Sequence, residues 1–353
     1  MLNPYANRGA IRSPEEFFGR TQELSKIYSL MSRGHSVFLI GERRVGKSSI
    51  LNAIAFGFDE ERDSQEILSD LCFVFVDSQL FQKASEKDFL KFLLNRIAKA
   101  AGTSVLEPDR TSLLRVAQEL ASRPKRQRLA VLLDEIDLLI HNPKIPADLF
   151  SFLRAWAQLF QIPFIVASRE GSIEPLVETA GPGSPFWNIF IGVYVGPMQE
   201  QEAMELISTP AERLGYPFTP GEISQILQLG GYHPFFLQLA CYHMFDLKAE
   251  RAQVSPEFAS LELAFRSEAV PHLSYLLQHL TEAERRALSS YVVSASLPKG
   301  IIQAELLRKG ILINGPEGLR LFSSTFGDLV RSVESPTSAK ASNLQRMLGN
   351  LLE

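Results

Sequence analysis

Cysteine and long apolar runs are both scarce in this sequence. Only two of its 353 residues are cysteines, Cys72 and Cys241, which are too few for a disulfide framework, and both lie in apolar runs. No apolar run approaches the roughly 20 residues that span a bilayer. Residues 1–9 lack the apolar segment of a secretory signal. We therefore expect a soluble, cytoplasmic protein with reduced, buried thiols.

Charge of one sign and metal-ligand spacing are also lacking. Lys and Arg number 36 against 40 Asp and Glu, a net charge of −4, which gives no general electrostatic attraction to nucleic acid but leaves a local basic patch open. The six histidines show no ligand spacing beside cysteine or acidic pairs, so no zinc site is predicted. The sequence shows no Ser-His-Asp arrangement of a hydrolase. Its composition is that of an ordinary globular chain.

Five short apolar runs predict a parallel sheet. They are continuous rather than alternating, which is typical of strands buried on both faces. Helical patterns lie between them, and another helix, with Thr21 as its candidate N-cap, precedes the first run. Residues 1–197 therefore read as one α/β domain with an N-terminal arm. The runs are Val37–Ile40, Leu71–Val76, Leu129–Leu133, Phe164–Ala167 and Phe190–Val195.

The strand signal stops after Pro197. Residues 198–270 read as a helical lid and linker, ending in a helix over Pro256–Arg266. Residues 271–333 have the helix–helix–helix–hairpin layout of a winged helix, and 334–353 read as a flexible tail. The predicted winged-helix elements are helices Tyr275–Leu280, Glu282–Tyr291 and Gly300–Arg308 and strands Ile311–Ile313 and Leu319–Phe322.

The strongest chemical signal is the segment Gly41–Ser48, which fits G-x-x-x-x-G-K-[ST] without departure. It follows the first predicted strand and opens a helix, where backbone N–H groups can converge on a phosphate. In this pattern Lys47 reaches the β and γ phosphates, Ser48 coordinates Mg²⁺, and Ser49 adds a contact to the α phosphate. A random match occurs in roughly one chain in a hundred of this length.

A second signal is the run Leu129–Glu135, a buried strand that ends in two acids. In this Walker B pattern Asp134 holds Mg²⁺ through water and Glu135 acts on the attacking water as a general base. Acids often follow buried strands, so the pattern gains its weight from the P-loop in the same sheet. Both motifs end strands at the edge where such sheets bind their ligands.

Three further segments have two readings each. Arg169, after the fourth strand, either contacts the γ phosphate or is a surface residue. The segment Gly230–Pro234 either serves a ligand or is a turn between helices. The pair Phe17 and Phe18, ahead of the P-loop, either flanks an adenine base or packs in the core.

Taken together, these segments resemble the STAND class of P-loop ATPases, and within it the archaeal and bacterial AAA-like ATPases. The run Phe18–Leu24 is similar to the hhGRxxEL box of that class, and Gly41–Ser49 and Leu129–Glu135 to its Walker A and B motifs. Ala167-Ser168-Arg169 is similar to its sensor-1 motif, and Gly230–Pro234 to its GxP motif.

The resemblance implies a sheet of order 5-1-4-3-2, a helical lid and a winged helix, in a Mg²⁺-dependent ATPase that holds ATP or ADP between core and lid. The catalytic residues would be Lys47, Asp134, Glu135 and Arg169, with Ser48 and Asp134 on Mg²⁺. The nucleotide-binding residues that it implies are Phe18, Gly19, Arg20, Gly41, Arg44, Val45, Gly46, Lys47, Ser48, Ser49, His233 and Pro234.

The function that this pattern favours is a slowly hydrolysing molecular switch, in signalling or defence, with a protein partner or a homo-oligomer in the ATP state. The alternative is a DNA-binding regulator that uses ATP as a ligand. Between His272 and Arg331 seven basic residues face five acidic ones, a weak basic excess for DNA. A third reading, an ATP binder without turnover, is opposed by the intact pair Asp134 and Glu135.

Overall fold

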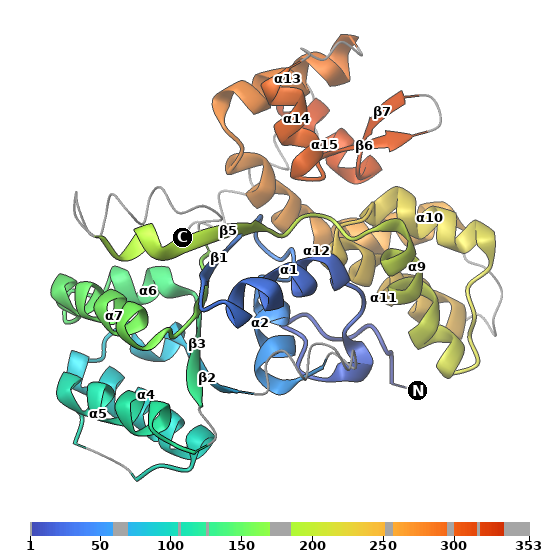
Figure 1. The fold of residues 1–353 in the computed structure, drawn as a ribbon. Coiled ribbons are helices and arrows are strands. Elements are labelled where there is room, and N and C mark those ends of the chain that lie inside the picture. Colours follow the sequence, from blue (N-terminus) through green and yellow to red (C-terminus); the bar gives the residue numbers. More distant parts are fainter. Residues whose placement is uncertain are drawn as a thin grey trace. The chain divides into compact units, whose positions relative to one another are not determined.

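The computed structural model describes residues 2–58, 70–104, 107–124, 127–169, 185–250, 257–294, 300–315 and 318–334 (Figure 1). Of the predicted tail, residues 335–353 lie outside this described part. Contacts divide the chain into two units, one formed by residues 10–195 and the other by residues 2–9 with 196–334. In the described part, no helix has the length and apolar character to cross a membrane.

The first unit is built on a five-stranded parallel sheet with the order β2-β3-β4-β1-β5. This confirms the predicted order 5-1-4-3-2. Each predicted apolar run forms one strand, with ends that shift by at most one residue. The strands are β1 (Ser36–Ile40), β2 (Leu71–Asp77), β3 (Arg128–Asp134), β4 (Phe164–Ala167) and β5 (Phe190–Tyr194).

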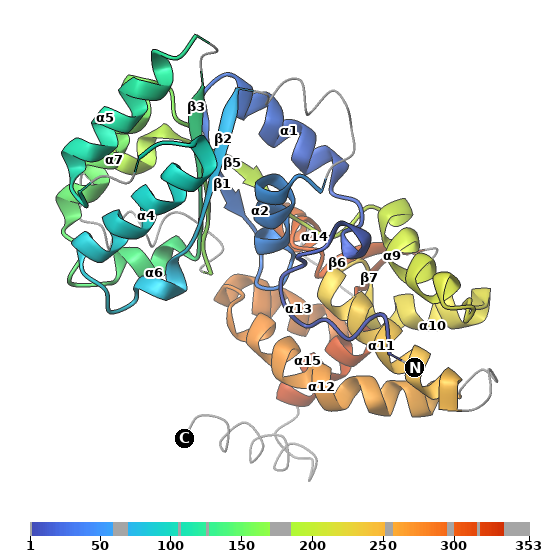
Figure 2. The same cartoon turned by 90° about the horizontal axis from the view of Figure 1, so that it is seen from below.

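Helices cover both faces of this sheet. Figures 1 and 2 show α4, α5 and α7 on one face and α1 and α2 on the other. The helices are α1 (Thr21–Ser32), α2 (Lys47–Phe56), α4 (Glu86–Ala101), α5 (Arg110–Ala121), α6 (Ile136–Ile140) and α7 (Ala147–Phe160). Three 3₁₀ turns, Pro14–Glu16, Ser78–Phe81 and Pro185–Ile189, complete the described elements of this unit.

Strand β3 shows why the apolar runs are continuous. Leu129, Val131 and Leu133 pack into the cluster under α4, α5 and α7. Ala130 and Leu132 pack into the cluster under α1 and α2. None of the five is more than 1% exposed, so both faces of the strand exclude polar side chains.

The start of α1 differs from the prediction. Thr21 is the first helical residue and not the N-cap, which is Arg20 in the left-handed region at φ 67°. Gly19 also has φ 67°. The Arg20 guanidinium is buried and donates to the Val45 carbonyl, and this contact holds a backbone conformation that local sequence does not indicate.

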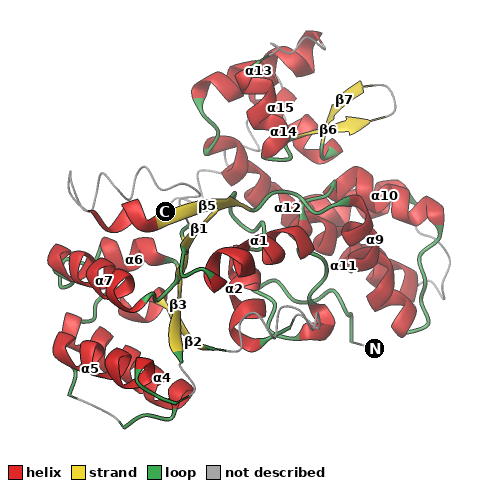
Figure 3. Ribbon diagram, in the orientation of Figure 1, coloured by secondary structure: helices red, strands yellow, loops and turns green. Residues whose placement is uncertain are grey.

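The second unit is helical apart from one antiparallel hairpin, as Figure 3 shows. Its helix α15 was not predicted from the sequence. The helices are α9 (Glu200–Arg213), α10 (Pro220–Gly230), α11 (Pro234–Glu250), α12 (Phe258–Gln278), α13 (Glu282–Ser294), α14 (Ile301–Arg308) and α15 (Ser324–Glu334). The hairpin strands are β6 (Leu312–Gly315) and β7 (Gly318–Leu321).

Helix α12 is one continuous element where two separate helices were predicted. It runs through Pro271, and the predicted boundary between residues 270 and 271 lies inside it. Ala269 and Leu273, on either side of the proline, are both fully buried. Their burial offsets the roughly 3 kcal/mol that an interior proline costs a helix.

Residues 2–9 belong to the second unit, although the prediction placed them with the ATPase core. Arg8 forms an ion pair with Glu268 at 2.6 Å. The Tyr5 side chain, 2% exposed, donates its hydroxyl hydrogen to the Ile207 carbonyl and accepts from the Ala211 N–H at 3.2 Å. Both groups belong to α9 and lie on either side of Pro210, so the hydroxyl contacts this helix at its interior proline.

Replacing Tyr5 with Phe is expected to lower the free energy of unfolding by about 1–3 kcal/mol, because it leaves two buried backbone groups without this partner. Urea unfolding measures the change. In a Pro210→Ala background the cost should fall, since a regular helix lets the Ala211 N–H bond the Ile207 carbonyl directly. Equal costs in both backgrounds would contradict the role assigned to the hydroxyl.

Candidate active site

The loop between β1 and α2 has the backbone that the Walker A pattern predicts. Gly46 caps α2 at φ 105°, and Arg44 lies in the left-handed region at φ 64°. A Cβ atom on Gly41 would lie 2.3 Å from the Val195 carbonyl oxygen, so only glycine fits there. The loop therefore begins pressed against the end of β5 and ends at a helix N-terminus, a geometry suited to an anion.

Lys47 folds back over this loop. Its Nζ atom donates to the carbonyl oxygens of Gly41 at 2.6 Å and of Glu42 at 2.9 Å. The side chain is buried, and burial lowers its pKa to about 8, although Glu42 and Asp134 partly oppose the shift. The ammonium is thus held by neutral carbonyls at a cost in solvation, and an anion would offset that cost.

Asp134 ends β3, next to the first turn of α2. Its carboxylate accepts a hydrogen bond from the Ser48 side chain. Burial raises its pKa to about 6, and the neighbouring charges of Glu135 and Asp77 add to the effect. The structure therefore brings Ser48 and Asp134 together, as the two motifs predict.

Glu135 follows at φ 48°, an unusual backbone for glutamate. Burial raises the pKa of its carboxyl group, while a hydrogen bond from Gln79 and the charge of Arg169 lower it. Gln79 and Asp77 were not predicted as site residues. The sequence did carry a signal for Asp77, which is an acid directly after the second apolar run. In the structure it pairs in register with Asp134 at the end of the adjacent strand.

Arg169 is paired with a residue that the sequence analysis missed. Its Nε atom donates to the carboxylate of Asp137 at 2.7 Å, and Asp137 is 1% exposed. The Arg169 side chain itself is 47% exposed. The sequence signal for Asp137 was a third acid, two residues after Glu135, in the first helical turn after β3.

Arg20, of the hhGRxxEL-like box, stabilises the P-loop through a hydrogen bond to its backbone. Its guanidinium is 3% exposed and bonds the Val45 carbonyl at 2.7 Å and the Glu23 carboxylate at 2.8 Å. The box therefore fixes the backbone that precedes Gly46. Phe18 is half-buried, and its contact with a nucleotide stays a prediction.

Ser49 holds a preceding segment of the chain. Its hydroxyl accepts from the Ile11 N–H at 3.0 Å, and Asn52 donates to the Ile11 carbonyl at 2.8 Å. The first turns of α2 thus anchor the segment around Ile11 as well as ending the P-loop. Neither Ile11 nor Asn52 was predicted.

His233 and Pro234 lie in the second unit, in the turn between α10 and α11. His233 is buried with its ring 4.8 Å from that of Phe236. Gly231, at φ 57°, would place a Cβ atom 2.8 Å from the Phe322 carbonyl. The turn is therefore tightly packed, and its predicted role in nucleotide binding stays a prediction.

The sequence matches the family described as Novel STAND NTPase 2 over residues 21–297, more than three quarters of the chain. The match includes both Walker motifs and Arg169. The chain belongs to this STAND NTPase family. No curated protein matches it.

Solved structures are similar to this STAND NTPase in fold. A Walker-type ATPase of Pyrococcus abyssi aligns with a TM-score of 0.60 at 16% identity, over 93% of this chain and 99% of that one. The ORC2 protein of Aeropyrum pernix, in its ADPNP–ADP complexes, aligns at 0.57 and 16% identity over 93% and 95%. Its ADP form aligns at 0.55 and 15% identity over 94% and 96%.

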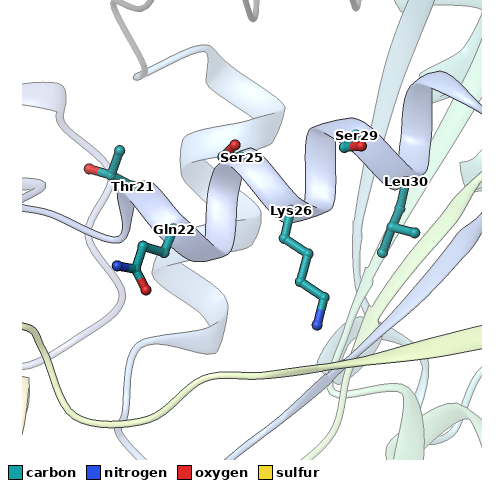
Figure 4. Close-up of a pocket in the computed structure, with 6 residues that line it drawn as sticks. All are labelled: Thr21, Gln22, Ser25, Lys26, Ser29 and Leu30. Atoms are coloured by element: carbon teal, nitrogen blue, oxygen red, sulfur yellow. The ribbon is translucent and has the colours of Figure 1, made fainter.

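A shallow groove on the STAND NTPase lies along α1, away from the residues of the Walker motifs. It has a volume of about 520 Å³ and is lined by Thr21, Gln22, Ser25, Lys26, Ser29 and Leu30. In Figure 4 its lining side chains, among them Gln22 and Lys26, extend from a single helix. With no side chain from a second element, the groove offers little to enclose a ligand.

Replacing Asp134 with Asn is expected to stabilise the ligand-free STAND NTPase above pH 6. The folded protein holds this proton more tightly than the unfolded chain, because the pKa rises from 3.8 to about 6, so ionisation costs stability as pH rises through that range. The gain should be about 1–3 kcal/mol at pH 7.5 and vanish below about pH 4.

Thermal unfolding across this pH range measures the gain. Asp148→Asn is the matched control, because hydrogen bonds from Arg110 lower the pKa of that exposed carboxyl group, so its loss should bring no gain. A destabilised D134N variant at pH 7.5 would contradict the account.

Proposed function

We propose that this STAND NTPase binds ATP, hydrolyses it slowly, and differs in conformation between its ATP and ADP states. The observation that carries the proposal is the meeting of Lys47, Ser48 and the acids Asp134 and Glu135 at the carboxyl ends of β1 and β3. A signalling or defence role in the cytoplasm is proposed from the resemblance to the STAND class.

The phosphates would lie against the loop from Gly41 to Gly46. The backbone N–H groups of Arg44, Val45 and Gly46 precede a helix N-terminus, where partial positive charge favours an anion. Lys47 would exchange its loop carbonyls for phosphate oxygens, and Ser49 would contact the α phosphate. Phe18 and Gly19 would lie near the adenine base. Arg20 would keep the P-loop in place through its bond to the Val45 carbonyl.

The donor set at Ser48 and Asp134 fits a magnesium ion. Both side chains supply oxygen, and the hydrogen bond between them places these oxygens side by side. In the part of the chain that is described, no cluster of three or more His, Cys, Asp or Glu side chains could hold a metal. Two protein oxygens completed by phosphates and water are typical of Mg²⁺, which would neutralise charge on the phosphate oxygens.

For hydrolysis, Glu135 would accept a proton from the attacking water. Its pKa is raised by burial, which moves a carboxylate toward the range of an effective base. Arg169 would contact the γ phosphate and so distinguish ATP from ADP. A switch needs such a difference, since a ligand shifts a conformational equilibrium only through unequal affinity for the two states.

We further propose that α13, α14 and the β6–β7 hairpin form a winged helix used for packing and not for DNA. Several basic residues of this region pair with acids: Lys309 pairs with Glu284 at 2.9 Å, and Arg308 pairs with Glu305. Lys299 and Glu317, which the charge comparison included, lie outside the described residues.

Two variants test nucleotide binding and turnover separately. Lys47→Ala should weaken ATP binding by at least about a hundredfold, because a charged contact to phosphate is lost. Glu135→Gln should bind ATP within a few-fold of the unsubstituted protein but release phosphate at least about a hundredfold more slowly. Calorimetry and single-turnover phosphate release give these values.

The control is Lys26→Ala, which removes an exposed lysine of the same unit. It should change neither measurement. An unsubstituted protein that binds no adenine nucleotide would end the proposal. A Glu135→Gln variant with unchanged turnover would remove the role of that residue as the base.

A gel-shift titration with duplex DNA tests the alternative function. The expected result is no complex at 50–200 mM salt, about the range in which phosphate contacts lose most affinity. A complex whose affinity falls steeply with salt, and which Lys309→Gln weakens, would favour the DNA-binding regulator instead.

A further inference from the structure

Asp137 is a buried carboxylate with three donors aimed at it. Its Oδ1 atom accepts from the Ser168 hydroxyl at 3.1 Å and from the Arg169 backbone N–H at 3.0 Å. Its Oδ2 atom accepts from the Arg169 Nε at 2.7 Å. The two carboxylate oxygens thus have separate tasks: one fixes the chain after β4 and the other holds the guanidinium.

This arrangement joins two neighbouring strand ends. Asp137 lies in the first turn of α6, directly after β3, and Arg169 lies just after β4, the adjacent strand of the sheet. A carboxylate with 1% exposure would be costly without a cation and donors, so the pair resists separation. The guanidinium donates to Oδ2 through its Nε atom, which fixes the direction in which the side chain leaves the backbone.

A second carboxylate competes for Arg169. The charge of Arg169 lowers the pKa of Glu135, so the guanidinium lies within electrostatic reach of the proposed base. Without Asp137, we expect Arg169 to turn toward Glu135. Such a pair would withdraw the arginine from the γ phosphate and neutralise the base in the same step.

We propose that Asp137 is a positioning residue: it holds the Arg169 guanidinium at the end of β4, apart from Glu135, so that Arg169 meets the γ phosphate of ATP. The inference rests on the proposed function, in which Arg169 contacts that phosphate. Asp137 itself touches no substrate in this account.

Asp137→Asn separates the two tasks of the carboxylate. The amide oxygen can keep the bonds from Ser168 and the Arg169 N–H, while the amide nitrogen at Oδ2 cannot accept from Nε. The variant should bind ADP within about twofold of the unsubstituted protein. It should bind a non-hydrolysable ATP analogue roughly tenfold to a hundredfold more weakly, the effect of one lost charge-assisted bond.

Three comparison variants sharpen the test, with calorimetric affinities for ADP and the analogue as the readout. Arg169→Gln should show the same selective loss, and the double variant with Asp137→Asn should lose no more than either single one. Ser168→Ala removes a bond to Oδ1 only and should leave the ratio of the two affinities unchanged. Should Asp137→Asn fail to fold, Arg169→Lys replaces it, because lysine keeps the charge but lacks the Nε donor.

Each outcome decides the matter. A selective, non-additive loss of analogue affinity supports the positioning role. Equal losses for ADP and the analogue indicate a purely structural residue and overturn it, as does an unchanged ratio in Asp137→Asn or Arg169→Gln. An unsubstituted protein that binds neither nucleotide overturns the proposed function itself, and that result is visible before any variant is compared.

Discussion

The site depends on burying opposite charges where the parallel strands end. Burial works against ionisation at both Lys47 and Asp134, lowering the pKa of the first to about 8 and raising that of the second to about 6. The burial of apolar side chains on strands such as β3 offsets the free-energy cost of burying these charges. A phosphate and a cation are the ligands that would relieve it.

The surroundings of the loop hold its shape without a ligand. Arg20 bonds the Val45 carbonyl from one side, Gly41 rests against Val195, and Ser49 and Asn52 anchor the segment at Ile11. Groups fixed in advance lose little entropy when an anion arrives, which is the general advantage of a preorganised site. The hhGRxxEL box therefore has a structural task whether or not it also touches the base.

The second unit relies on contacts between residues far apart in sequence. Tyr5 completes α9 beside Pro210, and the Gly230–Gly231 turn packs so closely on Phe322 and Leu237 that side chains are excluded. In both places a residue that breaks regular structure is accommodated by a partner from elsewhere. Proline and glycine here mark tertiary contacts as much as chain turns.

Sequence alone was enough for the five strands, their parallel order by resemblance, and the two Walker motifs, because strand burial and phosphate-binding loops depend on residues close along the chain. It did not reveal the left-handed Arg20, the unbroken α12, helix α15, or the pairing of Asp137 with Arg169. Those features depend on groups brought together from distant segments, whose burial and hydrogen bonds outweigh local propensity. Only the folded chain decides which carboxylate faces which cation.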